Sequence, residues 1–117
     1  MTIETIVDKQ LTAYNAKDFE TFASCYHKEI VSYHLESSLP DPKMSGTSFF
    51  DHYRKKFKEN PNLNCRVTKR ILHDNLIVDQ EWISGYQGQD HTEMVIYQIE
   101  NGLITKMWFR KEKPVPK

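Results

Sequence analysis

The sequence predicts an α+β fold in which three N-terminal helices pack on a curved antiparallel β-sheet with a mixed edge, together forming a cone. Two observations predict this class. Apolar residues recur every three or four positions in three stretches before residue 60, which is typical of helices. Residues 63–111 instead contain four long alternating stretches separated by turn residues, which is typical of an antiparallel meander.

Capping residues and apolar stripes indicate the first two helices. Thr2 can cap a helix that runs to Tyr14, and the polar segment 15–17 ends this helix. Asp18 is a good N-cap for a second helix. The apolar stripes of the two helices contain Ile3, Ile6, Val7, Leu11, Tyr14, Phe19, Phe22, Ala23 and Tyr26.

A short strand is predicted at about residues 30–35. In a strand, alternate side chains point to opposite faces, so Ile30, Ser32 and His34 should share one face. We expect this face to be the inner one, with the His34 imidazole pointing into a cavity. The following segment, 36–45, contains two prolines and no periodicity, which makes it a candidate lid or rim.

The third helix and the meander complete the predicted fold. Ser45 or Thr47 should cap the helix, and the segment 60–62 should end it. Asn101 and Gly102 form a strong hairpin signal. The predicted strands of the meander are residues 63–73, 76–86, 92–99 and 103–111. Strands of roughly ten residues exceed the usual five or six, so the sheet should be strongly twisted.

The chain length sets the domain organisation. A chain of 117 residues is of ordinary size for one domain. We expect this domain to span residues 1–112. Residues 113–117 should form a flexible tail, because Pro114 and Pro116 keep this segment out of the sheet.

Composition and charge exclude several function classes. Sixteen basic residues balance sixteen acidic residues, whereas a protein that tracks nucleic-acid phosphates would show a basic excess. No apolar run reaches the roughly 18 residues of a membrane span. Cys25 and Cys65 lack motif spacing and are interpreted as reduced thiols. We therefore expect a cytoplasmic protein without nucleic-acid or membrane partners.

Motifs for metal, nucleophilic and phosphate chemistry are missing from the sequence. None of the five histidines lies in an HxxxH or HExxH pattern, and no cysteine lies at ligand spacing. There is no GxSxG segment, and four glycines leave little room for a phosphate-binding loop. We therefore expect neither a metal ion nor a cofactor.

Four stretches of the chain carry a family resemblance: AYNAKDFETFASCYHKEIVSYH, SGTSFFDHYRKKF, GYQG and YQIENGLITKMWF. From about residue 3 to residue 111, the chain resembles the nuclear transport factor 2-like superfamily, which includes SnoaL-like polyketide cyclases and ketosteroid isomerases. The resemblance implies a cystatin-like roll and a homodimer. Because this fold hosts many chemistries and many non-enzymes, the function must be argued from the pocket.

The resemblance to ketosteroid isomerases implies roles for individual residues. The position of the catalytic base falls on His34, and an unperturbed imidazole with a pKa of about 6.5 can take a proton near neutral pH. The position of the tyrosine donor falls on Gln10. The position of the acid donor falls near Val95, with Glu93 two residues earlier on the same face.

The donor residues of a ketosteroid isomerase are not retained, which argues against steroid isomerisation itself. If the protein is an enzyme, we expect a cofactor-independent isomerase, cyclase or lyase. His34 would remove a proton next to a carbonyl, and Tyr14, Gln10 or Tyr97 would donate to the developing oxyanion. The alternative is that His34 is structural and is satisfied by a neighbouring group.

Aromatic residues and one carboxylate are expected to line the cavity and contact a small apolar or carbonyl-bearing ligand. Glu93 should be the only carboxylate on the inner face, where it either forms an acid–base pair with His34 or is solvated at the mouth of the cavity. The alternative for the aromatic residues is that they form plain core. The predicted substrate-binding residues are Phe50, Tyr53, Phe57, Trp82, Glu93, Tyr97, Met107 and Phe109.

The opposite face of the sheet is predicted to be apolar. Val78, Ile83, Met94, Ile96 and Trp108 should project away from the helices. An apolar patch of this kind is costly to leave in water. We therefore expect a homodimer built sheet against sheet.

Three function classes follow from this interpretation: a proton-abstracting enzyme, a non-catalytic small-molecule binding protein, and a homodimeric interaction module. The size of the inner cavity discriminates between them. An open cavity beside His34 favours the first two classes, and a cavity that holds only a few waters favours the third.

Overall fold

The computed structural model describes residues 2–112. The predicted tail, residues 113–117, lies outside the described residues. The elements follow the chain in the order α1 (Ile3–Ala16), α2 (Phe19–Ser24), β1 (Tyr26–His34), a short 3-10 helix η1 (Pro42–Met44), α3 (Thr47–Glu59), β2 (Asn64–His73), β3 (Leu76–Tyr86), β4 (Gln89–Glu100) and β5 (Leu103–Glu112).

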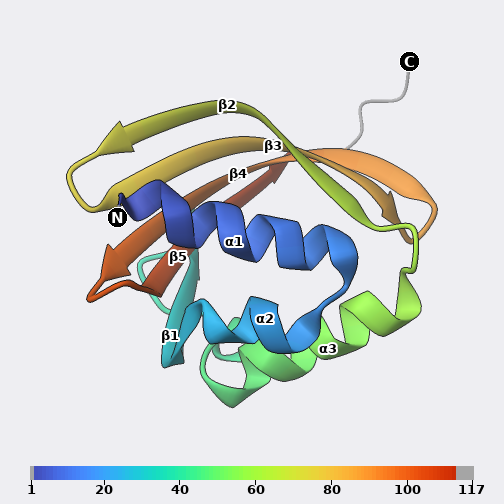
Figure 1. The fold of residues 1–117 in the computed structure, drawn as a ribbon, viewed down its shortest axis with the longest axis horizontal. Coiled ribbons are helices and arrows are strands. Elements are labelled where there is room, and N and C mark those ends of the chain that lie inside the picture. The colour runs from blue at the N-terminus through green and yellow to red at the C-terminus, as the bar shows by residue number, and fades with distance from the viewer. Residues whose placement is uncertain (1, 113–117) are drawn as a thin grey trace.

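The five strands form one sheet in the order β1-β5-β4-β3-β2. All neighbouring pairs are antiparallel except β1 and β5, which are parallel, so the predicted mixed edge is confirmed. The long strands arch over α1, while α2 and α3 lie on the far side of α1 from the top of the arch (Figure 1). The predicted α+β class with helices on one face of a curved sheet is therefore confirmed.

Local chemistry explains the helix boundaries. Lys17 adopts the left-handed conformation with φ of 58°, and its N–H bonds the carbonyls of Ala13 and Tyr14, which ends α1. The Asp18 carboxylate accepts from the Thr21 N–H, so the predicted cap of α2 is confirmed. Thr2 is the N-cap residue of α1, as predicted, although its side chain makes no capping bond.

The cap of α3 also differs from the prediction. Gly46, with φ of 55°, is the N-cap rather than Ser45 or Thr47. The Ser45 hydroxyl instead accepts from the Ser32 N–H and donates to the Asp41 carbonyl. Ser45 therefore holds the loop against β1 and is not free to cap the helix.

Two strands are longer than predicted. β1 begins at Tyr26 because this residue already pairs with Ile104, although the register is interrupted before the pairing resumes at Val31. β4 begins at Gln89 because it pairs directly with Tyr86 across the turn. Alternation in the sequence does not reveal strand residues next to an irregularity or a tight turn.

The core lies between the helices and the concave face of the sheet. Phe22 and Phe49 are almost completely buried, and their rings contact those of Tyr26 and Tyr53 at centroid distances of 4.8–4.9 Å. Such tilted aromatic contacts add stability beyond simple area burial. The aromatic spacing of α2 and α3 therefore builds the closed end of the cone.

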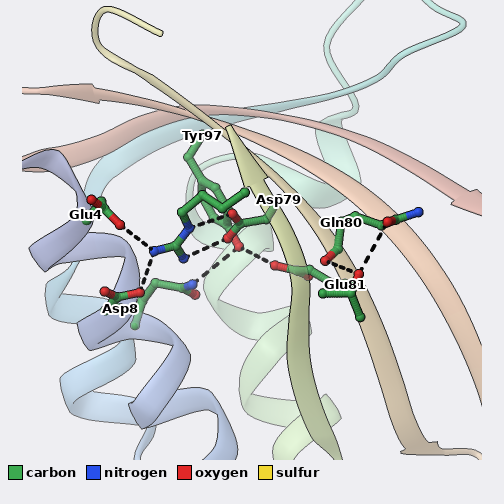
Figure 2. Close-up of polar contacts among 9 residues, drawn as sticks. Glu4, Asp8, Asp79, Gln80, Glu81 and Tyr97 are labelled. Atoms are coloured by element: carbon green, nitrogen blue, oxygen red, sulfur yellow. Dashed lines mark hydrogen bonds and ion pairs between the residues drawn. The ribbon is translucent and has the colours of Figure 1, made fainter. Parts of the chain in front are cut away.

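A partly buried ion cluster ties β2, β3 and α1 together (Figure 2). The Arg70 guanidinium donates two bonds to the buried Asp79 carboxylate, at 2.7 and 2.9 Å. Its remaining nitrogen lies 2.7 Å from Asp8 and 3.4 Å from Glu4, both on α1. A register shift at Thr68 turns Arg70 to the inner face, because the pairing changes on either side of this residue.

We expect Arg70→Met to destabilise the protein strongly, because it leaves the Asp79 carboxylate buried without a cation. Breaking a buried pair in this way lowers the free energy of unfolding by about 3–5 kcal/mol. Urea unfolding monitored by circular dichroism measures this change. The matched control is Asp8→Asn, which removes an exposed partner of the same guanidinium and should cost about 1 kcal/mol or less. Equal losses for the two variants would contradict this account.

Candidate functional site

A small internal cavity lies between the helices and the inner face of the sheet. It offers about 20 Å³ to the centres of water molecules, which is room for a single water. Its wall combines apolar groups with an unusual number of polar and ionisable side chains. The polar and ionisable residues of the wall are Gln10, Tyr14, Tyr26, Tyr53, Lys56, Cys65, Glu81, Glu93 and Tyr97.

Two buried glutamates face each other across strands β3 and β4. Glu81 pairs directly with Glu93 in the sheet register, and both side chains line the cavity. Side chains at directly opposed positions lie close together, so the two carboxyl groups share one site. Burial, and then the neighbouring charge of Glu93, raise the pKa of Glu81 to about 8. Glu81 is therefore a neutral acid at pH 7.

A bulge in the hairpin produces this pairing. Tyr86 faces Gln89 at the turn, but a register shift between Ile83 and Tyr86 gives residues 76–83 a different alignment with β4. Gly85 lies in the shifted segment with φ of 73°, and a Cβ atom there would lie 2.2 Å from the Asn62 carbonyl oxygen. Only glycine fits both the positive φ and the close backbone contact.

A chain of hydrogen bonds runs from Glu81 through Tyr97 to Gln10 on α1 (Figure 2) and on to Tyr26 at the start of β1. The Tyr97 hydroxyl donates to Glu81 at 3.0 Å and accepts from the Gln10 side-chain amide at 3.3 Å. The Tyr26 hydroxyl donates to the other end of the Gln10 amide at 2.7 Å. Burial raises the pKa of both phenols well above the ordinary value, so both stay neutral hydrogen-bond donors.

Among residues 2–112, Lys56 is the only lysine in the wall of the cavity. Its ammonium group lies over the rings of Tyr14, Tyr53 and Tyr86, at 5.6, 5.3 and 4.8 Å from their centroids. Burial is the main effect on the Lys56 pKa and lowers it, and it outweighs the attraction of Glu93. The Asn60 side chain fixes the backbone here, because it donates to the Lys56 carbonyl and accepts from the Gln87 N–H of the hairpin.

The structure brings some of the predicted site residues to this cavity and leaves others away from it. Those that line the cavity are Gln10, Tyr14, Tyr53, Glu93, Tyr97, Met107 and Phe109. Phe57 is buried in the aromatic core. Phe50 is half-buried, and its ring packs edge-on against Phe49 at 5.3 Å.

The expectation that His34 points into the cavity is wrong. Its side chain is 60% exposed, and its ring nitrogen lies 2.9 Å from the Asp41 carboxylate in the loop. Ile30 and Ser32, on the same side of β1, are buried. His34 lies on the same side of β1 as Ile30 and Ser32, but it ends the strand. At this point a loop, and not a helix, covers the sheet, so the His34 side chain stays exposed.

The expected positions of Trp82 and Ile83 are reversed. Ile83 is buried and lines the cavity, whereas Trp82 is 42% exposed and donates to Asp90 on the outer face. The register between β3 and β4 is continuous from Leu76 to Ile83, so strict alternation holds along this stretch. Val78 and Ile83 therefore cannot share a face.

The sequence interpretation also missed the central acid. Glu93 is not the only inner carboxylate, because Asp79 and Glu81 are buried on the same face. Alternation from Ile77 would have found both. Lys56 was hidden because it lies between the aromatic positions Tyr53 and Phe57 of α3, where a basic residue is normally interpreted as solvent-exposed.

No three His, Cys, Asp or Glu side chains in residues 2–112 cluster in a way that could hold a metal ion. The helices of this part of the chain are too short or too polar for any of them to cross a membrane.

Comparisons with solved structures identify the fold. An uncharacterized cystatin-fold protein from Novosphingobium aromaticivorans superposes with a TM-score of 0.82 at 13% identity, over 94% of this chain and 98% of that chain. IdmH from Streptomyces antibioticus, provisionally described as a polyketide cyclase, gives 0.75 at 11% identity over 96% and 93%. A Kribbella flavida protein provisionally described as a ketosteroid isomerase gives 0.77 at 12% identity over 98% and 81%.

The chain therefore has the nuclear transport factor 2-like, cystatin-like fold. This fold is shared with SnoaL-like and ketosteroid isomerase-like proteins, as the sequence predicted. No model of a protein family matches the sequence, and no curated protein matches it either. At these low identities the structural likeness establishes the fold, and the function has to be argued from the cavity.

The raised pKa of Glu81 predicts a pH-dependent stability. The folded protein binds the Glu81 proton up to pH about 8, whereas the unfolded chain loses it near 4.5. The free energy of unfolding should therefore fall by a few kcal/mol as the pH rises through this interval, and level off above it.

Urea unfolding at pH 5, 6.5, 8 and 9 measures this slope. Glu81→Gln keeps the shape of the neutral acid and should flatten the slope. Glu36→Gln, at an exposed loop position, should leave the slope unchanged. A slope that persists in Glu81→Gln would show that another group is responsible.

Proposed function

We propose that the protein is an acid–base enzyme that takes a small carbonyl compound into the inner cavity and moves a proton at the carbon next to the carbonyl. The observation that carries the proposal is the opposed pair Glu81 and Glu93 on the cavity wall. Paired titratable groups whose environments separate their protonation states are the usual sign of an acid and a base.

The two glutamates take different roles in this proposal. Glu81 is protonated at neutral pH and donates a hydrogen bond to the carbonyl oxygen as negative charge develops there. Glu93 is the base that accepts the α-proton. Tyr97 and Gln10 hold Glu81 in position through the hydrogen bonds already described.

Burial gives a second argument for a functional cluster. A marginally stable domain gains nothing from a buried acid that has no cation, because the ionised form is costly and the neutral form depends on pH. Asp79, on the same strand, shows the structural solution, which is a bidentate arginine. Glu81 lacks such a partner among the described residues, which supports a chemical role.

The cavity has room for only one water, and by its size alone it favours the interaction module. Catalysis therefore requires the cavity to widen before a ligand enters. The Lys56 side chain extends from α3 toward Tyr86 at the β3–β4 hairpin and fills the space between them. A long unbranched side chain can move without disturbing the backbone. We therefore expect a small ligand to displace Lys56 from its present position.

The test of this function is deuterium exchange at the α-carbon of small ketones. Acetone and cyclopentanone in D₂O, followed by NMR, should exchange faster with the protein than in buffer. Glu93→Gln should reduce the added rate by about a hundredfold or more, the usual contribution of a positioned base.

His34→Ala is the matched control, since its exposed imidazole lies outside the cavity wall, and this variant should retain the rate. Circular dichroism verifies that each variant folds. Exchange no faster than in buffer across a broader ketone panel, or exchange indifferent to Glu93→Gln, would contradict the proposal.

The outer face supports a second proposal, a homodimer. A groove of about 500 Å³ crosses this face, lined in part by Ile71, Val78 and Met94. Ile71, Trp82 and Met94 are 64%, 42% and 38% exposed. A symmetric pair of sheets would cover this surface in both copies at once. The small cavity favours this assembly role independently of any catalysis.

Sedimentation equilibrium tests the dimer. The wild-type chain should show the mass of two copies, and Met94→Arg should show the mass of one, because it would bury an unpaired charge in each half of a symmetric interface. Leu39→Arg is the control, since Leu39 is 72% exposed on the loop after β1. A monomeric wild type, or equal dissociation by both variants, would contradict the outer-face dimer.

A further inference from the structure

We propose that Lys56 is a nucleophile that condenses with a small aldehyde or ketone to form an imine in the inner cavity. The inference rests on the proposed function, from which it takes the class of ligand, a small carbonyl compound. It adds a covalent step that acid–base chemistry alone does not require. It is carried by the position of one amine among neutral phenols, beside an acid–base pair.

The surroundings of Lys56 differ from those of a structural lysine. The described residues include no carboxylate oxygen within ion-pair distance of its Nζ. Its neighbours are instead the faces of Tyr14, Tyr53 and Tyr86. Aromatic faces stabilise a cation less well than a paired carboxylate in a dry site. This environment favours a larger neutral fraction of the amine than an exposed lysine has, in agreement with its lowered pKa.

The other groups required for imine formation lie in the same cavity wall. Glu81 is a neutral acid at pH 7 and lines the cavity together with Glu93 and Lys56. Tyr97 holds the Glu81 carboxyl by donating to one of its oxygens. The wall thus contains an amine, a proton donor and a proton acceptor.

The step balances without an oxidant or a reductant. The Nζ lone pair forms a bond to the carbonyl carbon, the carbonyl π electrons move to oxygen, and this oxygen takes the Glu81 proton. The nitrogen then loses a proton to the Glu81 carboxylate, which passes it to the hydroxyl oxygen. The nitrogen lone pair forms the C=N bond as the C–O bond breaks, so water leaves and the imine is protonated. The protonated imine acidifies the adjacent C–H bond, so Glu93 would remove this proton more easily than from the free carbonyl compound.

Two other lysines of α3 provide internal controls. Lys55 and Lys58 lie on the same helix and are exposed, whereas Lys56 is buried. All three meet the same reagents in one molecule. A difference in their reactivity therefore reports the environment of Lys56 and not the reaction conditions.

The experiment is reductive trapping of the full-length protein with propanal and sodium cyanoborohydride at pH 7. Reduction converts the imine to a stable secondary amine, which peptide mass spectrometry locates after digestion at residues other than lysine. Lys56 should be labelled severalfold faster than Lys55 or Lys58, because burial lowers the pKa of Lys56 and leaves a larger neutral fraction of its amine at pH 7. Equal or slower labelling of Lys56 would overturn the inference.

Two variants complete the test. Lys56→Arg keeps the positive charge but cannot form the imine. Lys56→Met removes both the charge and the amine. Each variant should lose the fast phase of labelling. Deuterium exchange of ketones in the same variants separates this inference from the proposed function. Exchange that persists in a folded Lys56→Arg protein would show that Glu93 and Glu81 act without an imine, and would overturn the role of Lys56 alone.

Discussion

The strict alternation of β3 is the constraint on which the interior depends. It directs Ile77, Asp79, Glu81 and Ile83 into the cone, so two carboxyl groups enter the interior. Each carboxyl group needs a compensating interaction because an isolated buried charge is too costly. Asp79 obtains it from Arg70, which also draws α1 onto the sheet. Glu81 obtains it by keeping its proton.

These two solutions divide the interior into regions with different properties. Around Asp79 the charges are paired, the geometry is bidentate, and the contacts join three elements. Around Glu81 the neighbours are phenols, a thiol and a second carboxyl group, and the Cys65 pKa is itself raised by burial and by Glu81. The first arrangement holds elements together, and the second keeps exchangeable protons inside the protein.

The fold was predictable from the sequence because it depends on patterns that cover many residues. Several sequence signals indicate the same fold class independently of one another. They are the apolar stripes of α1 and α3, the Asn101-Gly102 turn and the alternation of the long strands. A single misjudged residue does not change the class of fold. The shared fold with the Novosphingobium aromaticivorans protein at 13% identity reflects the same redundancy.

The site was less predictable because it depends on single residues and on irregularities. Alternation predicted that His34 points inward, but its burial depended on whether a helix or a loop covers the end of β1. The Glu81–Glu93 pairing depends on the bulge before the hairpin turn, which shifts the register by one residue. Lys56 looked like part of a solvated basic run, and only the tertiary fold places it inside. The sequence therefore identified the cone and part of its wall, but not the acid or the amine.

The close contact between Gly85 and Asn62 anchors more than a turn. Asn62 follows directly on the segment that ends α3, and Asn60 in that segment bonds both Lys56 and Gln87. One corner of the molecule therefore sets the spacing between the amine on the helix and the two acids on the strands. A redesign of this cavity therefore has to keep a residue without a side chain at position 85, which lies outside the cavity wall.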